Sequence, residues 1–333
     1  MITRIRLKIP VQLGSDSAPF AKSAFPAFVT PPFLIPGALG NRSIAAPVDK
    51  APPRLWKEVG NYRLRLAGTP QDREAACRLR FKVFNIELGE GLESSYETGL
   101  DIDRFDTVCE HLLVEDKTSL RVVGTYRMQS GETAARRLGY YSGLEFNLAP
   151  YEPLRPGILE LGRAAIDRQH RTPEVLTLLW RGIAQYAHDM GLRYLLGCSS
   201  LNSCDPAEGW RMYRRLEHYR VPPEFETVPT AAYACPVHQR ARNGFENGFM
   251  KQKDVEAQPA PDAPDRSPNH PAAPTPLPVK VPKLLKTYLA IGARIAAPPA
   301  WDREFRTIDF LTLLDLQLLS AGARNRFLAP LAQ

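Results

Sequence analysis

Three aspartates stand within six residues, just before an apolar segment of the chain. The stretch GLDIDRFDTVCEHLLVED carries Asp101, Asp103 and Asp106, and the apolar run 112–114 follows. Carboxylates crowded against the start of a buried strand repel one another unless cationic groups neutralise them. The cluster is therefore a solvated loop, a metal site, or one half of a binding site whose other half comes from elsewhere in the chain.

Charged residues also stand beside other apolar segments. Arg80 lies in RLRFKVF, Arg127 ends VVGTYR, and Glu160 and Arg163 share LELGRAAID. Such charges are costly to bury unless they are paired. One interpretation is purely structural, because ion-pair networks that pin a sheet to a helix have the same pattern as binding sites. In it, the three arginines neutralise two of the aspartates and Glu160.

Metal sites are poorly supported by the spacing. The aspartate cluster lacks the glycine and the terminal glutamate of an EF-hand loop. The spacing of Cys198, Cys204, Cys235 and His238 is too long for a standard zinc knuckle. We expect no bound metal.

The apolar periodicity predicts alternating strands and helices. Thr69 followed by Pro70 is typical of a helix start, and apolar residues at three- and four-residue steps make 173–190 the best helix. Pro229 would place a candidate strand at 226–234 on a sheet edge. The other expected strands are 62–68, 110–116, 120–129, 157–167 and 193–200, and the other expected helices are 69–84 and 207–219.

Proline marks two breaks in this pattern. Residues 1–60 are proline-rich and predict a disordered N-terminal arm, and 256–280 form a proline- and alanine-rich spacer. The core is expected at 61–255. Residues 281–333 should complete the fold with an amphipathic helix that covers the sheet and a strand at 307–319 that is buried on both faces and returns to it. The fold class is α/β of the α+β type, with a mixed central sheet flanked by helices and a proline-rich insertion.

The bulk properties narrow the function classes. The net charge is +7 and the pI is about 9.2, which favours an acidic partner or an anionic membrane surface. No nucleic-acid-binding motif is present, so we expect no nucleic-acid partner. Five cysteines without framework spacing and the lack of an apolar run of about 18 residues predict a cytoplasmic protein. Peripheral contact with the inner face of the cytoplasmic membrane stays open.

The order of the charged motifs resembles a known family. RxxVF, DxDxxD, GTYR and ELGR follow one another as in the acyl-homoserine-lactone synthases, and more closely as in the ornithine-lipid N-acyltransferases. The blocks YYSGLEFNL, LELGRAAIDRQHR and LLGCSSL are also similar to the second family. The resemblance covers residues 62–250 and 279–328.

The resemblance implies a GNAT-like acyltransferase fold and reaction. A fatty or 3-hydroxyfatty acyl group would pass from acyl carrier protein to the α-amine of an amino acid, with ornithine favoured and a lyso-ornithine lipid as product. The acyl carrier protein thioester is then a substrate, and no bound cofactor is expected. Alternatives are an acyl-homoserine-lactone synthase, an N-acyltransferase for another amino acid, and a non-catalytic module that binds acyl carrier protein or membrane.

The same resemblance implies roles for the charged residues. An amine needs a base before it can attack a thioester, and Glu160 is the first candidate and Asp101 the second. Arg127 or Arg163 could bind the amino-acid carboxylate, and backbone N–H groups near 162–165 could stabilise the oxyanion. The residues implied to build the substrate site are Arg80, Asp103, Asp106, Arg127 and Arg163.

A carrier-protein donor fits the sequence after the central strand. DRQHRTPEV contains no glycine, whereas a pyrophosphate cradle for coenzyme A usually does. Acyl carrier proteins are acidic, so arginines could supply a complementary surface. The candidates are Arg168, Arg171, Arg181, Arg214 and Arg215.

Overall fold

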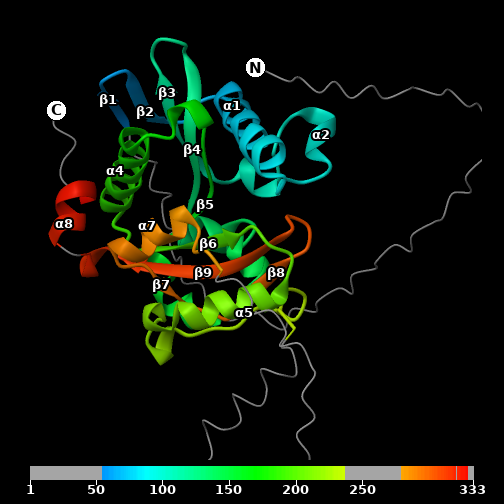
Figure 1. Ribbon diagram of the computed structural model, residues 1–333. Coiled ribbons are helices and arrows are strands. Elements are labelled where there is room, and N and C mark those ends of the chain that lie inside the picture. The colour runs from blue at the N-terminus through cyan, green and yellow to red at the C-terminus, as the bar shows by residue number, and fades with distance from the viewer. Residues whose placement is uncertain (1–54, 237–278, 320, 329–333) are drawn as a thin grey trace, which may run out of the picture. The chain divides into compact units, whose positions relative to one another are not determined.

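A mixed β-sheet forms the centre of the computed structural model, which describes residues 55–236, 279–319 and 321–328 (Figure 1). In the described residues the sheet has nine strands in the order β1-β2-β3-β4-β5-β6-β9-β7, and β8 also pairs with β9. Only β5 and β6 pair in parallel. The strands are Trp56–Val59 (β1), Tyr62–Leu66 (β2), Glu110–Asp116 (β3), Arg121–Ser130 (β4), Ile158–Ile166 (β5), Tyr194–Leu201 (β6), Arg294–Ile295 (β7), Ala300–Asp302 (β8) and Thr307–Asp315 (β9).

The parallel pair β5 and β6 is joined over only part of its length. Its register runs from Ile158 opposite Tyr194 to Glu160 opposite Leu196. Beyond that point β6 continues to pair with β9 on its other side, up to Leu201 opposite Ile308. The unpaired halves of β5 and β6 therefore leave an opening inside the sheet.

A β-bulge lies in β5 next to this opening. Thr125 pairs with Ala165 and Arg127 pairs with Gly162, so β5 has one residue more than β4 over this stretch. Arg163 has a φ of 52°, in the left-handed region. A bulge turns side chains and N–H groups away from the regular ladder. The bulge covers residues 162–165, whose backbone N–H groups are the candidate oxyanion donors.

The two main helices cover opposite faces of β2–β5 (Figure 1). Helix α1 (Pro70–Phe81) begins with a capping box between Thr69 and Asp72 and continues as a wider π-helical turn over Lys82–Leu88. Helix α4 (Pro173–Met190) begins at the Thr172 cap and ends at Gly191. These boundaries confirm both predicted helices.

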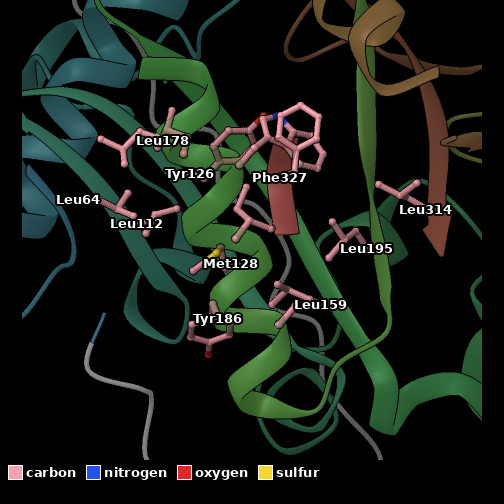
Figure 2. Close-up of a cluster of buried hydrophobic side chains, with 14 of the residues drawn as sticks. Leu64, Leu112, Tyr126, Met128, Leu159, Leu178, Tyr186, Leu195, Leu314 and Phe327 are labelled. Carbon is pink, nitrogen blue, oxygen red and sulfur yellow. The ribbon is translucent and has the colours of Figure 1, made fainter. Parts of the chain in front are cut away.

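The main core lies between α4 and the sheet (Figure 2). Leu64, Leu112 and Met128, from three successive strands, share this cluster with Leu178 of α4. Gly182 allows the close approach, because a Cβ at this position would lie 2.8 Å from a methyl carbon of Leu64. The apolar face of the helix, which repeats every 3.6 residues, thus packs against the apolar face of the strands, which repeats every two residues.

The last part of the described chain completes the sheet, as predicted. Strand β9 is buried over 307–314 and pairs with β6, β7 and β8. Helices α5 (Pro206–Arg215) and α7 (Lys283–Ile291) share a buried cluster with β9. Leu285 and Leu289 turn the apolar side of α7 into this cluster, so α7 covers the sheet as expected.

Several boundaries differ from the sequence prediction. The strand expected at 226–234 is wrong, because this segment makes turns and only isolated bridges at Pro229 and Ala234. Strand β1 lies inside the segment predicted as a disordered arm, and α5 ends four residues before the predicted end at residue 219. The remainder of the arm and most of the proline-rich spacer lie outside the described residues. The described residues contain no helix long and apolar enough to cross a membrane.

The close approach of β5 and β6 before the opening predicts that alanine at Gly197 and alanine at Gly162 have different effects on stability. A Cβ on Gly197 would overlap the carbonyl oxygen of Leu161, whereas a Cβ on Gly162 would meet no atom within 4 Å. We expect Gly197→Ala to lower the free energy of unfolding by about 1–3 kcal/mol, because the backbones of β5 and β6 must separate. Gly162→Ala, the matched control, should change it by about 0.5 kcal/mol or less. Urea unfolding measures both, and equal effects would contradict the close approach.

Candidate active site

The aspartate cluster is half of a buried ion-pair network. Arg80 on α1 donates from Nε to Asp101 Oδ2 at 2.8 Å, and from its two terminal nitrogens to both oxygens of Asp106, each at 2.8 Å. It also donates to the backbone carbonyl of Asp101. Arg80 and Asp101 are each only 1 % exposed, so the solvated-loop interpretation is wrong.

Two further arginines extend the network across the sheet. Arg127 on β4 donates to Asp103 Oδ1 at 2.7 Å and to Asp106 Oδ1 at 3.2 Å. Arg163, at the bulge in β5, donates to Asp103 Oδ2 at 3.3 Å and lies 3.7 Å from Asp101 Oδ2. Three arginines and three aspartates therefore alternate and balance in charge, and they join α1, the loop before β3, β4 and β5.

Electrostatics keeps Asp103 and Asp106 ionised. Burial alone would raise the pKa of Asp106, but the hydrogen bonds and charge of Arg80 hold it well below its usual range. Burial opposes the Arg127 charge at Asp103 in the same way, and the net pKa of Asp103 is lowered. His111 lies beside Asp106, and burial lowers its pKa to about 4, so it is neutral at pH 7.

A cavity of about 280 Å³ lies where β5 and β6 diverge. Residues 160–164 of β5 and 195–200 of β6 form two of its walls. One part of the lining is apolar and comes from β4, α4 and α7, with Tyr126, Trp180, Leu285 and Tyr288 among its residues. The remaining polar lining consists of charged, amide and hydroxyl side chains, which include Glu90, Arg127, Gln129, Tyr141, Ser142, Glu145, Glu160, Arg163, Ser199, Ser200, Asp302, Thr307, Asp309 and Thr312.

The predicted site residues divide between the cavity and the network behind it. Arg127, Glu160 and Arg163 line the cavity. Arg80 and the three aspartates are absent from the described lining. Arg80 holds the carboxylate of Asp101 behind the cavity wall, and the role of Asp101 as a base stays a prediction. Asp103 and Asp106 hold Arg127, and Asp103 also holds Arg163. Substrate binding by Arg80, Asp103 and Asp106 stays a prediction.

Glu160 reaches the cavity, but its oxygens already accept three hydrogen bonds. Gln129 Nε2 donates to Oε2 at 2.6 Å, and the backbone N–H groups of Tyr141 and Ser142 donate at 2.9 and 2.7 Å. These bonds fix the turn that follows β4 and α3 (Gly131–Arg136) against β5. The role of Glu160 as a base stays a prediction; its Oε1 accepts only the N–H of Ser142 and keeps a lone pair for the amine.

Arg127 and Arg163 face the ring of Tyr141. Their guanidinium carbons lie 5.1 and 5.2 Å from the ring centroid, within cation–π range. Phe305 stacks on Arg163 at 4.2 Å. Both guanidinium groups are held at the cavity wall. Binding of a substrate carboxylate by either arginine stays a prediction.

The five arginines proposed for carrier-protein contact are spread over several elements. Arg171 forms an ion pair with Glu87 at 2.5 Å, and Arg181 donates to the carbonyl of Arg326 at 3.0 Å. The other three, Arg168, Arg214 and Arg215, are exposed. Arg181 is on α4, which packs on β2–β5, whereas Arg214 and Arg215 are on α5, which packs on β9. Carrier-protein contact stays a prediction for each of them.

Sequence reasoning missed a second group of acids in the cavity. Glu145, Asp302 and Asp309 are buried, and each places a carboxylate oxygen within 4.8 Å of the others. Burial raises the pKa of Glu145 well above its usual range and that of Asp309 to about 6, with each acid raised further by Asp302. Asp309 carried a signal, because it interrupts the apolar run TIDFLTLL.

The network predicts a large cost for removing one partner. Arg80→Met leaves the carboxylates of Asp101 and Asp106 buried without their cation, and we expect it to lower the free energy of unfolding by about 3–5 kcal/mol. The matched control is Arg78→Met, two residues earlier on the same helix, which breaks an exposed pair with Glu74 and should cost about 0.3–0.5 kcal/mol. Urea unfolding of both variants tests this. A similar small loss in both would show that the network is dispensable.

The raised pKa of Glu145 predicts a pH-dependent gain in stability for Glu145→Gln. Its pKa in the folded protein exceeds the ordinary value of 4.5, so the wild-type chain loses stability as pH rises above about 4.5. The variant lacks this carboxyl group and escapes the loss. The difference in free energy of unfolding, variant minus wild type, should therefore grow between pH 5 and pH 8. Urea unfolding at both pH values tests this, and a constant difference would contradict the buried-acid assignment.

Comparison with known proteins places the chain in a family. A model of the acetyltransferase (GNAT) domain matches residues 79–181. The chain is 30% identical to an L-ornithine N(alpha)-acyltransferase of Brucella abortus, covering 79% of this chain and 87% of that protein, and 29% identical to the one of Rhodobacter capsulatus, covering 80% and 94%. The crystal structure of the acyl-homoserine-lactone synthase LasI aligns with a TM-score of 0.40 at 11% identity, over 80% of this chain and 94% of that one. The chain is therefore a GNAT-type N-acyltransferase and belongs to the L-ornithine N(alpha)-acyltransferase family.

Proposed function

We propose that this enzyme transfers a fatty or 3-hydroxyfatty acyl group from acyl carrier protein to the α-amine of L-ornithine, which gives a lyso-ornithine lipid. The observation that carries the proposal is the cavity between β5 and β6, whose lining combines an apolar part with an acidic part. An acyl chain suits the first and a cationic amino acid suits the second. The names of the relatives from Rhodobacter capsulatus and Brucella abortus support ornithine as the acceptor.

The reaction joins the two substrates at the opening of the sheet. The neutral α-amine attacks the thioester carbon, the tetrahedral intermediate expels the pantetheine thiolate, and the amine proton passes to a base and on to the thiolate. Glu160 is the candidate base at the cavity wall. Backbone N–H groups at the bulge around Arg163 would stabilise the oxyanion, and Arg127 or Arg163 would bind the ornithine carboxylate.

The start of α4 supports a carrier-protein donor over coenzyme A. Thr172 caps the helix through its own side chain, Pro173 has no N–H to offer, and Glu174 places a negative charge in the first turn. A pyrophosphate at a helix N-terminus needs free N–H groups and no such charge. Acyl carrier protein presents the acyl group on an arm with one phosphate, so this helix start does not oppose it.

The product explains where the enzyme would work. An N-acylated ornithine with a long chain partitions into lipid, so release is easiest at a membrane surface. Helix α7 lies at the apolar part of the cavity and carries Lys283 and Lys286 beside the partly exposed Leu284. We propose peripheral contact of this helix with the inner face of the cytoplasmic membrane.

A donor comparison tests the proposal. The purified full-length chain is given L-ornithine with either acyl carrier protein or coenzyme A carrying the same acyl group, and N-acylornithine is measured by mass spectrometry. We expect kcat/KM to be at least about 100-fold higher with the carrier protein, because only it supplies a protein surface for binding energy. Equal rates would refute the donor assignment. A product that forms only with S-adenosylmethionine would indicate a lactone synthase instead.

A further inference from the structure

Three buried carboxylates in the cavity come from separate parts of the chain. Glu145 follows a short turn after α3, Asp302 ends β8, and Asp309 lies in β9. Each is at least nine-tenths buried, and all three line the cavity. Their oxygens lie within 4.8 Å of one another. Like charges so close together repel, so Glu145 keeps its proton at neutral pH unless a cation takes that proton's place among the three acids.

The described part of the chain does not supply that cation. Arg163 donates to Asp103 and lies near Asp101, so its charge helps to neutralise these two aspartates. Glu145 Oε2 and Asp309 Oδ1 are buried and accept no hydrogen bond from the described residues. Ser199 Oγ, in a residue only 8 % exposed on the same cavity, also has no partner there. Buried polar atoms without partners point to a missing ligand.

Asp302 differs from the other two acids because it is anchored. Its Oδ1 accepts the backbone N–H groups of Glu304 and Phe305, each at 2.9 Å. Thr307 Oγ1 donates to Asp309 Oδ2 at 3.3 Å. Asp302 and Asp309 are thus held by the β8–β9 turn, and Glu145 is hydrogen-bonded to Asp309. Glu145 Oε2 and Asp309 Oδ1 are left without partners among the described residues. Fixed acceptors around an open space are what recognition of a cationic group requires.

We propose that Glu145, Asp302 and Asp309 bind the side-chain ammonium group of the acceptor amino acid and so select a dibasic substrate. An ammonium group has three N–H donors for three acceptor oxygens. Acceptors placed about 2.8 Å from one nitrogen along tetrahedral directions lie about 4.6 Å apart, which fits the spacing of the trio. This assignment rests on the proposed amino-acid acylation and goes beyond it by naming the residues that choose the acceptor.

The trio suits the non-reacting amine and not the α-amine. A carboxylate cluster favours the charged form of an amine, whereas the attacking amine must be neutral. The α-amine therefore belongs near Glu160 and the bulge, and the side-chain ammonium belongs at the trio. Glu160 would thus remove a proton from the α-amine, whereas the trio would keep the side-chain amine protonated.

An acceptor pair tests the assignment directly. L-norvaline has the same carbon chain as L-ornithine without the side-chain amine. With the acyl carrier protein thioester as donor, kcat/KM for ornithine should exceed that for norvaline by about 100-fold or more, because norvaline leaves the carboxylates unpaired. Glu145→Gln and Asp309→Asn should each lower kcat/KM for ornithine by about 10- to 100-fold without lowering that for norvaline, so the preference for ornithine shrinks. Glu110→Gln, which neutralises a half-buried carboxyl outside the cavity lining, should leave both values unchanged.

Thermal shift measurements give a readout that does not need turnover. Ornithine should raise the midpoint of unfolding of the wild-type chain and norvaline should not, and Glu145→Gln should abolish the difference while remaining folded. Loss of activity in the variants by the same factor with both acceptors would overturn the proposal, as would equal thermal shifts. Activity that is lost in EDTA and restored by a divalent cation would instead show a metal site. Failure of the wild-type chain to acylate either acceptor would refute the proposed function, and the thermal shifts would still decide on the trio.

Discussion

The alternation of three arginines with three aspartates is the interaction on which the rest of the structure depends. Arg80 on α1 reaches Asp101 and Asp106, and these in turn meet cations from β4 and β5. Four of these charges are buried and those of Asp103 and Arg163 are partly buried, so each would be destabilising without its partners. The set fixes α1 and the loop before β3 against one face of the sheet, and it fixes the side chain of Arg163 at the bulge. The network therefore fixes the positions of Arg127 and Arg163 in the cavity wall.

The cavity at the opening in the sheet has an apolar part and an acidic part. Beyond Glu160 the strands β5 and β6 no longer pair, and the cavity that lies there meets apolar side chains from α4 and α7 as well as acids from β8 and β9. The acids of the network are neutralised by arginines of the protein, whereas the trio around Glu145 lacks such a partner among the described residues. The three aspartates that are paired with arginines support the cavity wall. The trio of Glu145, Asp302 and Asp309, which lacks such cations among the described residues, is the proposed binding site.

Much of the fold could be predicted from the sequence because its periodicity is strong. The apolar steps of 173–190 and the continuous run at 307–314 gave a helix and a fully buried strand where the structure has them. The network was foreseeable because Arg80 and Arg127 each stand beside apolar runs. The strand at 226–234 failed because Pro229 lacks an N–H and the segment turns instead. The acidic trio was missed because 145, 302 and 309 converge only through the pairing of β8 with β9 and the return of β9 to β6, which no local pattern encodes.

We propose above all that this enzyme acylates a cationic amino acid with a fatty acyl chain. Lipid mass spectrometry of a bacterial host that lacks acylated amino acids, before and after expression of the full chain, tests it most directly. We predict that a new series of lipids appears whose fragments contain ornithine in amide linkage to one fatty or 3-hydroxyfatty acyl group. A series built on a neutral amino acid, or unchanged lipids in cells that contain soluble enzyme, would contradict the claim.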